Sequence, residues 1–128
     1  MPKTRLRRAT DTVPELKSAP DSPEAAACIR RADEATSRGG AAYERLLRLA
    51  ESSQAGQAGI VAEFIASTVG YVRFDLYDLR ALDVELSDDV LSCLDAIRWG
   101  RVHLCDLVRD GTVRANTVSH EWGYNSQS

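Results

Sequence analysis

The chain has 128 residues, of which 44% are hydrophobic and 27% charged, and its formal net charge is −3. This composition excludes a chain that is disordered throughout, and the length suits one domain with one hydrophobic core. No run approaches the roughly 18 apolar residues of a membrane-spanning helix, because Glu63 and Gly70 interrupt the most apolar stretch. The basic N-terminal residues precede no apolar stretch, and the three cysteines show no metal-ligand spacing. We therefore expect a cytoplasmic protein without membrane contact.

Residues 1–22 have the least capacity to form a core. They are basic and contain most of the prolines, and they hold few large apolar side chains that could offset the entropy of ordering. We expect a disordered, mobile tail there. Ser22 and Pro23 then offer an N-cap and a first helical residue, so residues 23–39 are expected to form a short helix and a linker, with the helix ending before Gly39 and Gly40.

Residues 41–123 are predicted to form a helical domain. Two segments place their side chains at the i, i+3, i+4, i+7 spacing of one helical face. The first face comprises Tyr43, Leu46, Leu47 and Ala50, and the second comprises Val61, Phe64, Ile65 and Thr68. The second helix is expected to end near Gly70, because glycine readily adopts the left-handed conformation of a helix stop.

Two further helix starts are predicted downstream. Asp75 can cap a helix by accepting a backbone N–H, and Ser87 can cap the next one, with two aspartates in its first turn. Leu86 is expected to pack on Leu91 across that cap, and Gly100 is expected to be the left-handed stop of the same helix. The shared core is predicted to contain Phe64, Ile65, Leu76, Leu79, Leu82, Leu91, Leu94 and Ile97.

The C-terminal part is expected to begin with a brief turn over residues 104–111 that ends at Gly111. Residues 112–118 fit a helix or a strand, because the relevant propensities differ by only about a few tenths of a kcal/mol. We favour the helix, since no second alternating segment is available to pair with a strand. With residues 124–128 expected to be disordered, the predicted fold class is all-α: four to six short helices packed as one small domain, with a mobile N-terminal tail.

The segments AYERLLRLA, VAEFIAS, FDLYDLRALD, SDDVLSCL and IRWGRVHL follow one another over residues 41–108. This pattern resembles a family of small uncharacterised proteins carried by proteobacterial plasmids and integrative elements. Its most recognisable element is the FDLxDL segment at residues 74–79, which is followed by an acidic helix start. The resemblance implies an accessory gene of a bacterial mobile element, and it carries over no reaction and no functional residues.

The residues that could support chemistry do not predict an enzyme. The histidines, His103 and His120, lie near Cys105, Asp106 and Glu121, but His103 and Cys105 are two positions apart, which on a helix directs them to different sides. No calcium loop, phosphate-binding glycine loop, nucleophile elbow or zinc-protease motif occurs in the sequence. We therefore expect no catalytic residue, no cofactor and no metal ion.

The charge pattern instead predicts an acidic surface. Residues 1–40 hold eight basic residues against six acidic ones, whereas residues 41–128 hold eight against thirteen. Between residues 74 and 95, seven acids accompany a single basic residue, Arg80, so a negative patch is expected that attracts basic proteins and repels DNA. The candidate partner-binding residues are Asp83, Glu85, Asp95, Tyr77, Trp99 and Trp122.

We expect a non-enzymatic accessory protein that acts by protein–protein binding. A narrower form of this hypothesis is an inhibitor of a host defence complex, whose nucleic-acid channel the carboxylates would occupy in place of phosphates. The alternative is a small DNA-binding regulator, because two short helices joined by a tight turn resemble a helix-turn-helix. The Ser-Asp-Asp start of the second helix argues against that alternative, since phosphates would repel it. The sequence predicts neither the identity of the partner nor the oligomeric state.

Overall fold

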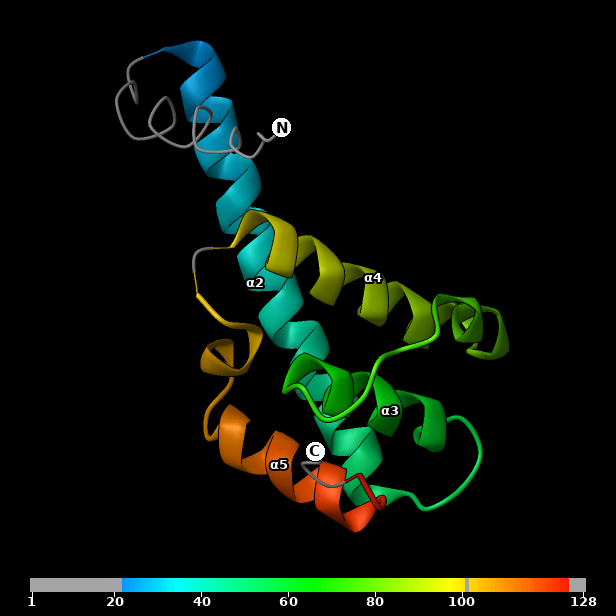
Figure 1. The fold of residues 1–128 in the computed structure, drawn as a ribbon. Coiled ribbons are helices and arrows are strands. Elements are labelled where there is room, and N and C mark those ends of the chain that lie inside the picture. The colour runs from blue at the N-terminus through cyan, green and yellow to red at the C-terminus, as the bar shows by residue number, and fades with distance from the viewer. Residues whose placement is uncertain (1–21, 101, 125–128) are drawn as a thin grey trace, which may run out of the picture. The chain divides into compact units, whose positions relative to one another are not determined.

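The computed structural model describes residues 22–100 and 102–124. These residues form four α-helices and two 3₁₀ helices, and no strand occurs among them (Figure 1). The elements are α2 (Pro23–Ser52), α3 (Ala58–Thr68), η2 (Leu76–Ala81), α4 (Val84–Trp99), η3 (Leu104–Leu107) and α5 (Gly111–Glu121). The all-α prediction is therefore confirmed.

The chain divides into two compact units, residues 1–34 and residues 35–128. The core and the surfaces discussed below belong to the second unit. The predicted tail over 1–22 and the predicted C-terminal segment over 124–128 lie outside the described residues, apart from Ser22 and Tyr124. None of the described helices has the length and hydropathy to cross a membrane.

Helix α2 begins as the sequence predicts and ends later. The side chain of Ser22 accepts the backbone N–H of Ala25 at 3.0 Å, which confirms the N-cap. The predicted end before Gly39 and Gly40 is wrong, because α2 continues through both glycines. Gly39 is buried where α4 approaches, and a Cβ atom built on it would lie 2.2 Å from the Cβ of Ala96. The glycine thus permits close helix packing rather than a helix stop.

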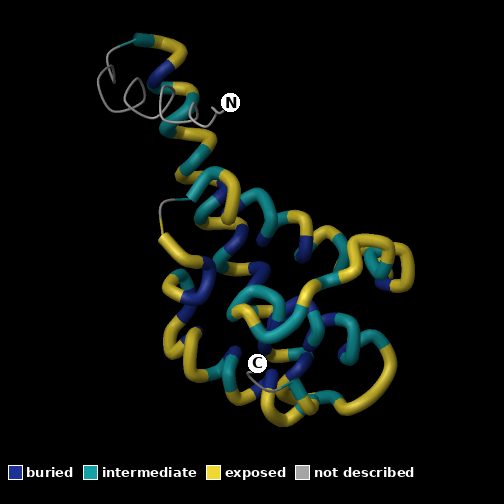
Figure 2. The backbone as a smooth tube through the Cα atoms, in the orientation of Figure 1, coloured by how far each residue is buried: buried dark blue, intermediate teal, exposed yellow. Residues whose placement is uncertain are grey.

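The core forms where the second half of α2 meets α3 and α5 (Figure 2). All four side chains of the predicted α2 face are buried: Tyr43, Leu46, Leu47 and Ala50. Helix α3 adds Val61, Phe64 and Ile65, and α5 adds Ala115 and Val118. Helix α3 ends before Gly70, whose φ of +88° confirms the left-handed turn there. The two amphipathic helices were predicted correctly because their apolar faces have a clear helical period.

The start at Asp75 is confirmed, and its Oδ1 accepts the backbone N–H of Tyr77 at 3.0 Å. The element that follows is a six-residue 3₁₀ helix rather than an α-helix. Leu82 is buried and Leu79 packs against the core, but Leu76 is 64% exposed, so its placement in the core was wrong. Only the second half of this short element reaches the core, which leaves its first residue in solvent.

Helix α4 starts earlier than predicted. Oδ1 of Asp83 accepts the backbone N–H of Leu86 at 2.9 Å, so Asp83 is the N-cap and the predicted cap at Ser87 is wrong. The earlier start removes the predicted contact of Leu86 with Leu91 across the cap. The helix buries the small residues Val90, Cys93 and Ala96 against the rest of the unit. Leu91 and Ile97 are each 52% exposed and do not belong to the core, contrary to prediction, whereas Leu94 packs against its edge.

The predicted helix end at Gly100 is confirmed, but the left-handed conformation predicted there is wrong, and so is the predicted stop at Gly111. Helix α4 does end at Trp99, but Gly100 has a φ of −77°, outside the left-handed region. Gly111 is the first residue of α5, and the left-handed residue beside it is Asp110, with a φ of +56°. Gly111 is buried against η3, where a Cβ would lie 2.0 Å from the carbonyl oxygen of Cys105. Residues 112–118 are helical, as we favoured.

Candidate functional site

The histidines and cysteines are placed in local structural contacts. Nδ1 of His103 accepts the backbone N–H of Cys105 at 3.2 Å, which caps η3. The buried Cys105 sulfur lies 3.4 Å from the hydroxyl of Tyr43, and that hydroxyl lies 2.6 Å from Oγ1 of Thr68. His120 stacks edge-on against Tyr71, with 5.4 Å between ring centroids. Within residues 22–100 and 102–124, no group of three or more His, Cys, Asp or Glu side chains could hold a metal ion.

Four of the seven acids on η2 and α4 have structural partners. Asp75 and Asp83 cap their helices. Asp89 pairs with Arg45 of α2 at 2.7 Å, and Asp95 pairs with Arg98 one turn later at 2.7 Å. The expected negative patch is therefore smaller than the sequence suggests, because arginines neutralise part of it. Of these seven acids, Asp78, Glu85 and Asp88 take part in neither a helix cap nor an ion pair between described residues.

The six candidate partner-binding residues do not form one surface. Asp83 is engaged as the α4 cap and Asp95 in its ion pair, whereas Glu85 is exposed in the first turn of α4. Trp122 packs on the core, and its indole N–H donates to the carbonyl oxygen of Ala50 at 3.2 Å. Trp99 is half-buried at the end of α4.

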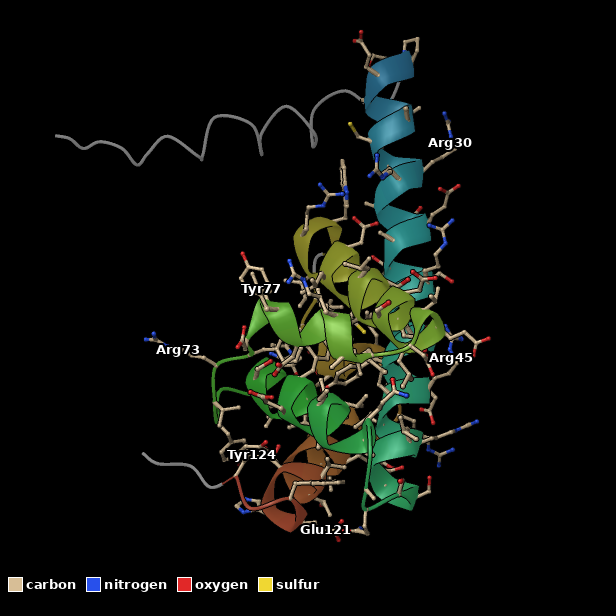
Figure 3. All side chains as sticks on the ribbon, turned by 90° about the vertical axis from the view of Figure 1, so that its right-hand side faces the viewer. Arg30, Arg45, Arg73, Tyr77, Glu121 and Tyr124 are labelled. Carbon is tan, nitrogen blue, oxygen red and sulfur yellow. The ribbon has the colours of Figure 1, made fainter. Side chains whose placement is uncertain are left out.

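Tyr77 is the exposed aromatic residue of the set, with 71% of its surface accessible. Figure 3 shows it pointing outward from η2. The guanidinium carbon of Arg80 lies 5.0 Å from the centre of its ring, a cation–π contact that orders the ring without covering the whole of it. Leu76 beside it is also exposed. Two large apolar side chains therefore stand in solvent at the start of η2.

Three carboxylates gather at the same place. Glu63 of α3 is close enough to η2 that its pKa is raised, first by burial and then by the charges of Asp78 and Asp75. The pKa of Tyr124 is also raised, by burial and by Glu63 and Asp78. No ion pair between described residues involves these three acids. We name the set Glu63, Asp75, Asp78, Leu76 and Tyr77 the acidic corner.

Sequence reasoning missed the role of Glu63. The available signal was a lone acid inside the apolar run GIVAEFIAST, where it lies on the border of a buried helical face. In the sequence alone, Glu63 is notable only as a charge that interrupts the most apolar stretch. That η2 folds back beside α3 is a tertiary feature, which periodicity along the chain does not contain.

Several hollows lie elsewhere on the second unit, and two of them border α4. A shallow groove of about 640 Å³ runs along α4, and we name it the α4 groove; it is lined by Arg38, Asp88, Leu91, Ser92, Leu94, Asp95 and Arg98. A smaller hollow of about 370 Å³ is lined by Ser67, Thr68, Ile97, Val102, His103 and Leu104. The hydroxyls of Ser67 and Thr68 donate to carbonyl oxygens of their own helix, each at 2.6 Å, which leaves few free donors in the smaller hollow.

The chain belongs to DUF7673, a family of unknown function, which matches residues 40–123. No curated protein and no solved structure matches the chain significantly. The resemblance described above is to a family of uncharacterised proteins, and the family match agrees with it in that respect. The plasmid or integrative-element setting stays a prediction.

Proposed function

We propose that this protein acts by binding another protein through the acidic corner, as a non-enzymatic accessory factor of a bacterial mobile element. The observation that supports this proposal is the exposure of Leu76 and Tyr77, at 64% and 71%, beside carboxylates that have no basic partner among the described residues. Tyrosine is enriched among the residues that dominate binding energy at protein interfaces. An apolar pair bordered mainly by carboxylates, with Arg80 over the Tyr77 ring, offers both contact area and a means of selecting a partner.

The charge of the corner indicates a basic partner surface. Glu63 lies beside Asp78 and Asp75: burial raises its pKa first, and the charge of Asp78, a hydrogen bond with Asp78 and the charge of Asp75 raise it further. A lysine- or arginine-rich surface would relieve the mutual repulsion of these carboxylates, and it would be attracted before contact. In the narrower form of the proposal, the partner is a host defence complex and the carboxylates occupy positions that phosphates take in its nucleic-acid channel.

Affinity capture from the natural host with the tagged full chain tests the proposal. Leu76→Ser with Tyr77→Ser removes the apolar pair, and Val113→Ser is the matched control because Val113 is 66% exposed on α5. We expect the parent and the control to capture the same protein, and the double variant to lose it. All three chains should have the same helical circular dichroism, since the altered side chains are exposed. Equal capture by all three would contradict the proposal.

A second pair of variants tests the charge. Asp78→Asn removes one carboxylate of the corner with little change of shape, and Glu121→Gln removes an exposed one from the end of α5. The corner variant should bind the captured partner more weakly and with less dependence on salt, whereas the control should behave as the parent. Capture that disappears after nuclease treatment would instead favour the alternative of a DNA-binding regulator.

A further inference from the structure

We infer that α4 forms an antiparallel contact with α4 of a second copy of this chain. The outward face of α4 carries Val84, Asp88, Leu91, Asp95 and Arg98, which we name the α4 seam. These positions alternate between spacings of four and three residues, the spacing of a coiled-coil seam. Val84 is 73% exposed and Leu91 is 52% exposed. The opposite face of the helix is already used, because Val90, Cys93 and Ala96 are buried.

The α4 groove gives a second helix a place to lie. Leu91 and Leu94 line its middle, Asp88 lies toward one end of the helix, and Arg98 lies at the other. Asp88 and Arg98 are ten residues apart in the sequence, or roughly 15 Å along an α-helix. The groove therefore has two leucines, beside Ser92 and Asp95, between the charges of Asp88 and Arg98.

An antiparallel copy of α4 matches this order of charges. With a two-fold axis beside Cys93, Asp88 faces Arg98 of the second copy, and the reverse pair forms at the other end. Leu91 then lies level with Asp95 of the second copy and one residue along the helix from its Leu94, on each side of the axis. A two-fold contact requires a surface that is complementary to itself. The exchange of Asp88 and Arg98 between the two copies meets this requirement for charge. Antiparallel helices also bring each helix C-terminus near the N-terminus of the other, which is favourable for their dipoles.

The two charged residues are available for this exchange. Asp88 is exposed and takes part in no ion pair between described residues. The Arg98 side chain is 62% exposed; it pairs with Asp95 of its own helix and lies over the Trp99 ring, 5.6 Å from the ring centre. The ion pair is a surface contact of the kind that is readily replaced. A purely basic partner would be repelled by Arg38 and Arg98 in the groove, so the mixed charges favour a second copy. The contact does not use Leu76 or Tyr77 of the acidic corner.

Sedimentation velocity of the full chain over a range of concentrations tests this inference. The parent should form a dimer whose dissociation constant rises with salt. Asp88→Arg alone and Arg98→Asp alone each place like charges opposite one another, so each should weaken the dimer by at least about tenfold. Glu121→Arg reverses an exposed charge outside the seam and should leave the dimer unchanged.

Mixing the two single variants provides the sharpest result. Asp88→Arg and Arg98→Asp, each weak alone, should associate with one another, because every contact of the mixed dimer joins an arginine to an aspartate. One contact keeps the original Arg98 and Asp88, and the other joins the two substituted positions with the signs exchanged. The chain that carries both substitutions should likewise regain the dimer. A parent that stays monomeric at all concentrations would overturn the inference. So would a dimer that neither single variant weakens, or single variants that do not associate when mixed.

Discussion

Gly39→Ala tests the close packing of α2 on α4. The sequence pattern predicts a helix stop at this glycine, but the structure places it at the contact between the two helices. In an ordinary exposed helix this substitution gains about 1 kcal/mol, because alanine has the higher helix propensity. Here the new Cβ would lie 2.2 Å from the Cβ of Ala96 and 3.0 Å from the carbonyl oxygen of Ser92. Carbon atoms in good contact are about 3.5–4.0 Å apart, so α4 would have to move by more than about 1 Å.

The expected loss follows from these distances. Overpacking of a core costs about 1–3 kcal/mol, and the upper part of that range applies because no side-chain rotation can relieve a clash between two Cβ atoms. After subtraction of the gain in helix propensity, Gly39→Ala should destabilise the protein by about 1–2 kcal/mol. This corresponds to a fall in melting temperature of roughly 3–10 °C for a protein of this size.

Thermal and urea unfolding followed by circular dichroism would measure this change. Gly40→Ala is the control, because its Cβ would lie 3.3 Å from the Cβ of Leu107 and needs only a small adjustment, so its stability should match or exceed that of the parent. Ala96→Gly makes room for the new methyl group, so its combination with Gly39→Ala should be more stable than the sum of the single effects predicts. Effects that add within about 0.5 kcal/mol would refute the packing explanation.

Three further predictions concern the core, a cap and an ion pair. Leu46→Ala should cost about 2–5 kcal/mol by urea unfolding, since the side chain is fully buried. At protein concentrations where the chain is monomeric, the half-exposed Leu91 should tolerate alanine within about 0.5 kcal/mol, and similar losses at both sites would contradict the observed core. Asp83→Ala should cost about 0.5–2 kcal/mol by the same measurement because the α4 cap is lost, and an unchanged stability would place the cap elsewhere. Hydrogen bonding to Arg114 lowers the pKa of Glu44 in the folded state, so this stabilisation is present above the usual pKa of 4.5 and is lost as the pH falls further. The melting temperature of Arg114→Met should fall less steeply below pH 4.5 than that of the parent, and parallel curves would contradict the assignment.

The helices with a clear apolar period could be predicted from the sequence. Tyr43, Leu46 and Leu47 recur at helical spacing and are buried, and Ser22 caps α2 as its position before Pro23 suggests. Local preferences also explain the cap at Asp75. Where one local signal acts alone, the sequence is sufficient.

The errors arise where tertiary packing decides between local alternatives. Asp83 and Ser87 are both good N-caps, and the structure uses Asp83. The packing of Val90, Cys93 and Ala96 on the core then leaves Leu91 exposed. Gly39 is a residue type that often ends a helix, but in this fold it lets α4 pack closely on α2. No pattern within α2 predicts that contact. The acidic corner was missed for the same reason, because Glu63 and Asp78 are brought together only when η2 folds beside α3.

Hydrogen exchange on the complex with the captured partner tests the role of the acidic corner most directly. The partner should slow exchange of the backbone amides in residues 75–82, which follow the Asp75 cap, and it should leave α5 unchanged. Asp78→Asn should reduce this protection at the same partner concentration, whereas Glu121→Gln should not. If the partner slows exchange elsewhere but not in residues 75–82, the proposal that the acidic corner is the binding surface is contradicted.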